Sequence, residues 1–131
     1  MKKTYSGTCH CGAVRFEAEI DLGAGTFKCN CPICTKTRMW GAIVRPEKFR
    51  LLSGERNLKD YQPDGVHHVF CTNCGVRPYG WFEEPSGGTF YAVRLACLDD
   101  VDDEELASAP VTYHDGRNDR YDAAPSVMGH L

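Results

Sequence analysis

Residues 9–20 read Cys9-His10-Cys11-Gly12-Ala13-Val14-Arg15-Phe16-Glu17-Ala18-Glu19-Ile20, and they join a pair of metal-ligand residues to the clearest strand of the chain. From residue 13 to residue 20, apolar and charged residues alternate, which is typical of a half-buried β-strand. The two cysteines before it lie on the same side of an extended chain, about 6.6 Å apart, where they can share one ion. The stretch therefore predicts a β-sheet that begins beside a metal site.

The cysteines of the chain number eight, and seven of them fall into three tight clusters. Two tetrahedral zinc sites need eight ligands, so the clusters are one ligand short. A site with four thiolates is structural, whereas three thiolates leave a position for water or a substrate. In a reducing cytosol these spacings favour metal ligands over disulfides, and zinc over an iron-sulfur cluster. The clusters are Cys9/Cys11, Cys29/Cys31/Cys34 and Cys71/Cys74.

The segment Cys71-Thr72-Asn73-Cys74-Gly75 is typical of a zinc knuckle, in which two thiolates bracket a tight turn and the glycine takes a positive φ. Together with Cys9 and Cys11 it predicts a site with four thiolates, here called the closed cluster. His10 lies between two chelating cysteines and is therefore expected to point away from the metal, into solvent.

The segment Cys29-Asn30-Cys31-Pro32-Ile33-Cys34 places three thiolates within six residues, with Pro32 favouring a turn. We call these three thiolates the open cluster. All three can reach one zinc ion, and this site, with three protein ligands, is compatible with partial occupancy. A thiol that binds such an ion loses its proton, since a metal lowers a thiol pKa of roughly 8.5 sharply.

Several side chains remain candidates for a fourth protein ligand, although none is favoured over an external one. Cys97 is in phase with a predicted strand, so a packed core thiol is the preferred interpretation. His67 and His68 are adjacent in a strand and face opposite sides, so at most one faces the metal. His114 lies in a polar segment and is expected to be solvated.

Basic residues close to the open cluster could bind the carboxylates of an acidic thiol. Lys28, Lys36 and Arg38 are the candidates, and Lys36, two residues after the last cysteine, is the preferred substrate-binding residue. Trp40 and Phe82 could form walls of the pocket, although single aromatic residues more often belong to the core.

Short segments rich in aromatic and β-branched residues, separated by Pro, Gly, Asn and Asp, predict an all-β fold of antiparallel strands. At most one short helix is expected, over residues 102–107, where acidic residues begin the segment. Residues 1–131 are expected to form one domain, with the cysteine clusters within residues 6–100 and a loop-rich C-terminal tail at 110–131. The predicted strands are 13–20, 26–28, 40–45, 49–52, 58–62, 66–70, 78–82 and 89–95.

The bulk properties narrow the classes of function. The formal net charge is -3, which argues against the basic surface that binds a nucleic acid backbone. No segment approaches the roughly 18 to 20 apolar residues of a membrane span, and no signal peptide precedes the first cysteines. A cytoplasmic protein without membrane or nucleic acid partners is therefore expected, and nothing in the composition indicates an oligomeric state.

The order Cys-x-Cys, Cys-x-Cys-x-x-Cys and Cys-x-x-Cys-Gly, followed by Leu98-Asp99-Asp100, resembles the glutathione-dependent formaldehyde-activating enzyme family, which includes centromere protein V. The resemblance covers about residues 6–100. It implies an Mss-four-like fold of coiled antiparallel sheets with zinc knuckles, a structural zinc at the closed cluster and a catalytic zinc at the open cluster. There, glutathione and formaldehyde would combine into S-hydroxymethylglutathione, a carbon-sulfur lyase type reaction.

The chain departs from the family pattern outside its metal ligands. Asn30 replaces the usual His, Thr35-Lys36 replaces the common Arg-Lys, and Cys97 replaces a small residue. Two alternatives to this enzyme stay open: a zinc-stabilised protein-interaction module without catalysis, and a methionine sulfoxide reductase with Cys97 as nucleophile. The second is disfavoured, because residues 93–98 lack the Arg-x-Cys-x-Asn context of such enzymes.

Overall fold

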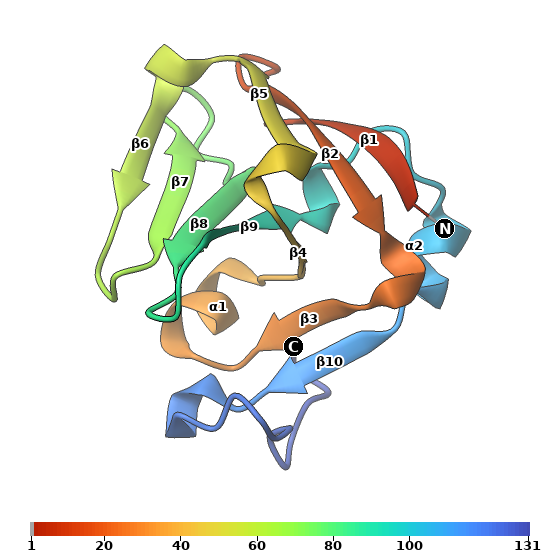
Figure 1. Ribbon diagram of the computed structural model, residues 1–131, viewed down its shortest axis with the longest axis vertical. Helices are drawn as coiled ribbons and strands as arrows, with labels where there is room; N and C mark the ends of the chain where they lie inside the picture. The colour runs from red at the N-terminus through yellow and green to blue at the C-terminus, as the bar shows by residue number, and fades with distance from the viewer. Residues whose placement is uncertain (1) are drawn as a thin grey trace.

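β2 (Arg15–Asp21) is the central strand of a three-stranded sheet, and its sequence explains why. Phe16, Ala18 and Ile20 are buried, while Glu17 and Glu19 on the opposite face are partly exposed. This alternation confirms the pattern predicted for this stretch. A computed structural model, which describes residues 2–131, places β2 between β1 and β5 (Figure 1).

A second, larger sheet contains seven strands in the order β10-β3-β4-β9-β8-β7-β6. Its neighbours pair antiparallel, except that β10 runs parallel to β3. The protein is mostly β, as expected, and the predicted strands are observed to within a few residues. The remaining strands are β1 (Lys2–Thr8), β3 (Thr26–Cys29), β4 (Gly41–Val44), β5 (Phe49–Ser53), β6 (Leu58–Tyr61), β7 (His67–Cys71), β8 (Tyr79–Glu83), β9 (Thr89–Arg94) and β10 (Val111–His114).

The main core lies between the two sheets. Phe16, Val93 and Leu95 are completely buried there, and the Phe16 ring stacks on Phe49 with 5.6 Å between ring centroids. Gly7 on β1 faces this ring, and a Cβ at that position would lie 2.2 Å from it. The close approach of β1 to β2 therefore requires glycine, in a strand that the sequence analysis did not predict.

Two short α-helices occur in the described residues, one more than expected. α2 (Asp103–Ser108) is the predicted helix, and Asp102 and Glu105 form its capping box. α1 (Pro32–Thr37) is additional: it begins with Pro32 at a position that favours proline, and the residue that caps its C-terminal end, Arg38, has a φ of 55°. Six residues are too few to show a helical period in the sequence, and the cysteine spacing here was interpreted as a turn.

The C-terminal tail is more ordered than the sequence indicated. β10 lies within the segment expected to be loop-rich, and residues 116–118 form a 3-10 helix, η5 (Gly116–Asn118). Parallel pairing with β3 is possible because the many residues between the two strands provide the long connection that it needs. Among residues 2–131, no helix has the length and apolar character needed to cross a membrane.

Candidate functional site

The closed cluster brings together two cysteine pairs that lie 60 residues apart in the sequence. The sulfur of Cys11 is 3.6 Å from that of Cys9 and 3.7 Å from that of Cys71. A zinc ion with four sulfur ligands at about 2.3 Å has tetrahedral edges of about 3.8 Å. The observed separations and the thiolate donors therefore fit zinc in a structural site.

Backbone amides and glycine turns shape the closed cluster. Val14 donates its N–H to the Cys9 sulfur at 3.3 Å, and Gly75, with a φ of 78°, donates to the Cys71 carbonyl at 2.7 Å. A hydrogen bond from the Val76 backbone lowers the pKa of Cys74 to about 6, whereas burial raises the pKa of Cys9. His10 is exposed and outside this group of ligands, as expected.

The open cluster is assembled by one continuous segment at the junction of β3 and α1. Cys29 ends β3, Cys31 precedes the first residue of α1, and Cys34 lies within that helix. Their sulfurs lie within 4.8 Å of one another, and no fourth Cys, His, Asp or Glu ligand among residues 2–131 belongs to this group. A hydrogen bond from Cys34 lowers the pKa of Cys29 to about 5 and raises the pKa of Cys34.

The loop that begins η5 covers one side of the open cluster. Gly116 is buried against it, and a Cβ there would lie 2.5 Å from the Cys29 sulfur and 3.1 Å from the Cys31 Cβ. No side chain fits at this position without displacing the sulfur. Gly116 could not be identified from the sequence, because nothing in a segment rich in Asp, Gly, Arg and Asn indicates which glycine is buried.

Asn30 holds this loop in place. Its side chain is buried and donates to Asp115 Oδ1 at 2.9 Å, while its own oxygen accepts the Arg117 backbone N–H at 2.9 Å. Both ends of the amide are therefore satisfied, which a buried polar group requires. Asn30 thus connects the open cluster to the C-terminal segment.

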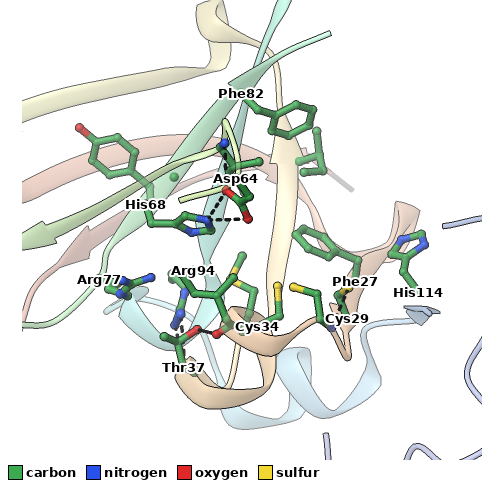
Figure 2. A pocket seen from close by; sticks show the side chains of 18 of the residues that line it. Phe27, Cys29, Cys34, Thr37, Asp64, His68, Arg77, Phe82, Arg94 and His114 are labelled. Carbon is green, nitrogen blue, oxygen red and sulfur yellow. Dashed lines mark hydrogen bonds and ion pairs between the residues drawn. The ribbon is translucent and has the colours of Figure 1, made fainter. Parts of the chain in front are cut away.

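A cavity of about 510 Å³ lies directly beside the open cluster and is bounded by β3, α1, β7, β8 and β9. Figure 2 shows the Cys29 and Cys34 sulfurs at one side, with Phe27 and Phe82 along a wall and His68 across from the sulfurs. Most of the lining surface is apolar, and polar groups contribute only a minority of it. The residues that carry these polar groups are Thr37, Asp64, His68, Arg77, Glu84, Arg94 and His114, in addition to the cysteines, Tyr79 and Tyr121.

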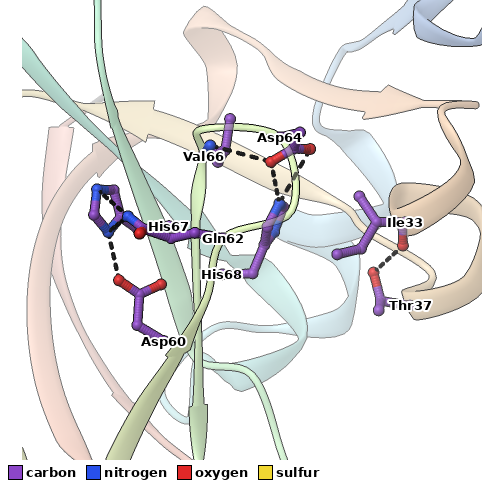
Figure 3. A network of polar contacts seen from close by, with 8 residues as sticks. All are labelled: Ile33, Thr37, Asp60, Gln62, Asp64, Val66, His67 and His68. Carbon is purple, nitrogen blue, oxygen red and sulfur yellow. Dashed lines mark hydrogen bonds and ion pairs between the residues drawn. The ribbon is translucent and has the colours of Figure 1, made fainter.

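The adjacent histidines of β7 face opposite sides, as predicted (Figure 3). His68 faces the cavity, and its Nε2 lies 3.3 Å from Asp64 Oδ1. Burial lowers the pKa of His68, which favours the neutral imidazole, although Asp64 acts in the other direction. His67 instead stacks on Trp81 and contacts the Asp60 carboxylate.

Two arginines form the end of the cavity nearest α1. Arg94 donates both of its terminal nitrogens to the Thr37 carbonyl, at 3.1 and 3.2 Å. Burial lowers the pKa of Arg94, and the positive charge of Arg77 lowers it further. Neither arginine is among the basic residues that the sequence favours, because the local sequence around either one gives no signal of the cavity that it faces.

The basic residues that the sequence favoured lie elsewhere. Lys36 is exposed on α1 and is absent from the described lining of the cavity, so its role in substrate binding stays a prediction. Lys28 lies over the Trp40 ring and donates to the Leu131 carbonyl, and Arg38 donates to the His130 carbonyl.

Of the predicted pocket walls, Phe82 lines the cavity and Trp40 does not. Trp40 instead packs against the main core and donates its indole N–H to Thr26 Oγ1 at 2.9 Å. Cys97 is a buried core thiol, as preferred, although it lies in a 3-10 helix (Leu95–Cys97) rather than a strand. Burial raises its pKa to about 11, so Cys97 stays protonated at neutral pH.

Comparisons with known proteins agree with the cysteine pattern. A sequence model of the family described as "Glutathione-dependent formaldehyde-activating enzyme" matches residues 4–115. The fold is also similar to the crystal structure of a protein from Rhodobacter sphaeroides, with 33% sequence identity and a TM-score of 0.68. That match covers 82% of this chain and 99% of the other.

Proposed function

Because this chain belongs to the glutathione-dependent formaldehyde-activating enzyme family, we propose that it is a zinc-dependent carbon-sulfur lyase type enzyme. Its substrates would be a small thiol such as glutathione and a small carbonyl compound such as formaldehyde, with S-hydroxymethylglutathione as the product. The cytosol, where thiols stay reduced, would be its compartment.

The observation that carries the proposal is the contrast between the two clusters, of which only the open cluster lies beside the cavity. The closed cluster has four sulfurs and would hold a structural zinc, whereas the open cluster has three and would hold a catalytic zinc. Cys29, Cys31 and Cys34 all line the cavity, so a ligand that enters it reaches the position that they leave free.

At the open cluster, a zinc ion would lower the pKa of an incoming thiol and keep it as a nucleophilic thiolate. In the overall reaction the thiol sulfur forms a bond to the carbonyl carbon, the carbon-oxygen π bond breaks, and the proton lost by the thiol ends on the oxygen. His68 faces the same cavity and is held by Asp64, so its neutral imidazole is suited to take that proton and return it. The apolar walls around Phe27 and Phe82 would limit the access of water.

The alternative, a protein-interaction module with two structural metals, requires a fourth protein ligand at the open cluster. The cavity supports the enzyme instead, because small-molecule sites are concave and mostly apolar with a few polar groups.

Glutathione-dependent consumption of formaldehyde tests the proposal, measured against the spontaneous rate without protein. The zinc-loaded protein is expected to exceed the spontaneous rate, and Cys31→Ser to fall back to it. Cys97→Ala, which removes a thiol outside both clusters, is the matched control and is expected to keep the activity. Equal rates with and without the wild-type protein would exclude this pair of substrates.

A further inference from the structure

Arg77 and Arg94 place two positive charges on one cavity without a carboxylate partner of their own. None of the salt bridges within residues 2–131 includes either guanidinium, and Arg94 donates only to a backbone carbonyl. Figure 2 shows both side chains at the end of the cavity that holds Thr37 and Cys34. Two like charges that repel each other in a partly closed space are costly unless an anion joins them.

The acidic residues of the cavity do not neutralise the two arginines. The Asp64 carboxylate accepts hydrogen bonds from His68 and from the Val66 backbone at 3.1 Å, and Glu84 is exposed. The arginines therefore present unused N–H donors toward the space beside the open cluster. Guanidinium groups match a carboxylate in a planar arrangement of two hydrogen bonds.

We propose that Arg77 and Arg94 bind the carboxylate of the thiol substrate, so that the cavity selects small thiols that carry an anionic group. This inference rests on the proposed function, and it replaces Lys36 as the anchor of the substrate. Arg77 is the specificity-determining residue to test first, because Arg94 also ties β9 to the end of α1 through Thr37. The pair could instead neutralise the negative charge of three thiolates on zinc. In that case the loss of Arg77 would weaken the binding of charged and neutral thiols equally.

The test compares two thiols of the same size, 3-mercaptopropionate and its neutral amide, 3-mercaptopropionamide, as ligands of the zinc-loaded protein. Calorimetry is expected to show about tenfold or tighter binding of the carboxylate, the range of a charged hydrogen bond. In Arg77→Gln that ratio should fall, because only one of the two guanidinium groups remains, while the affinity for the amide stays the same. Arg77→Lys should keep part of the ratio, and Arg56→Gln, which removes an exposed arginine on η3 (Glu55–Asn57), should keep all of it.

Two outcomes would overturn the inference. If Arg77→Gln weakens both thiols equally, the arginines act on the charge of the metal site rather than on the carboxylate. If Lys36→Gln removes the ratio and Arg77→Gln retains it, the anchor is the exposed lysine of α1.

A thiol-free experiment separates this inference from the proposed function. Propionate, and not propionamide, is expected to shift the Nε–Hε NMR signals of Arg77 and Arg94, and the absence of such a shift would overturn the inference. If propionate shifts these signals but neither thiol binds more tightly than its thiol-free analogue, the carboxylate site stands and the proposed thiol chemistry fails.

Discussion

The closed and open clusters use the same ligand chemistry, but the chain builds them in different ways. The closed cluster joins two pairs from distant segments, each followed by a glycine with positive φ, at Gly12 and Gly75. The open cluster comes from one stretch of six residues and opens on a cavity. A metal that connects distant segments contributes to folding, whereas one held by a local segment beside a cavity is free to exchange its remaining ligand.

The largest expected effect separates the clusters by stability. Cys71→Ser removes a buried ligand that connects β7 to the N-terminal segment, and it should lower the free energy of unfolding by more than about 5 kcal/mol, which is enough to unfold a typical domain. Cys34→Ser, the equivalent change at the open cluster, should leave the protein folded but abolish thiol binding. Thermal unfolding and calorimetry measure the two effects. Similar losses of stability in both variants would contradict the comparison.

Gly116→Ala should weaken the open cluster alone. The new Cβ would lie 2.5 Å from the Cys29 sulfur, so either the sulfur or the η5 loop must move, at a cost of about 1–3 kcal/mol. We expect the affinity of the open cluster for zinc to fall by roughly tenfold or more, the equivalent of at least about 1.4 kcal/mol. Metal competition with a chromophoric chelator measures this change.

The control for Gly116→Ala is Gly129→Ala, because a Cβ at Gly129 would meet no atom within 4 Å beyond its own chain neighbours. This control should leave both metal affinities unchanged. A Gly116→Ala protein that releases zinc from the closed cluster instead would show that η5 supports the other site.

Asn30→Ala should destabilise the protein by about 1–3 kcal/mol, because it leaves the backbone N–H of Arg117 without its acceptor and removes a donor to the buried Asp115. Asn73→Ala at the closed cluster is the matched change: Asn73 is exposed and its hydrogen bond to Cys11 lowers the pKa of that thiol. Urea unfolding should show a smaller loss for Asn73→Ala. A larger loss of stability in Asn73→Ala than in Asn30→Ala would mean that the hydrogen bonds of the Asn30 side chain contribute little to stability.

The smallest expected effect concerns pH. His68 should titrate below its ordinary value of 6.5, because burial disfavours the imidazolium form. Its contribution to stability is therefore present above about pH 6.5 and is lost as the pH falls through the lowered pKa of the folded state. Asp64→Asn should lower that pKa further, since the Asp64 carboxylate favours the charged ring. NMR titration of the zinc-loaded protein measures both values, and a His68 pKa above 6.5 would contradict the assignment.

The sequence was most informative where a short pattern carries its own geometry. Alternation in β2 and the glycine after Cys74 predicted a strand and a tight turn, and the spacing of the cysteines predicted the two groups that lie together in the structure. The strand β1 and the buried Gly116 depend on contacts with distant residues, so their local sequence contains no signal for them.

The same difference between local patterns and distant contacts explains why the sequence favoured Lys36, whereas two arginines line the cavity. Lys36 was favoured because it is close to Cys34 in sequence, yet the helix that carries both residues leaves Lys36 exposed. Arg77 and Arg94 are more than 40 residues away from the open cluster along the chain, and only the pairing of β8 with β9 and the packing of α1 bring their segments to the cavity.

The most direct test of the contrast between the clusters is the visible spectrum of the protein with cobalt in both sites, recorded during titration with glutathione. We predict that glutathione changes the absorption of one of the two cobalt ions, and that Cys34→Ser abolishes this change while the spectrum of the other ion persists. A spectrum that glutathione leaves unaltered, with four protein ligands on each cobalt, would contradict the account.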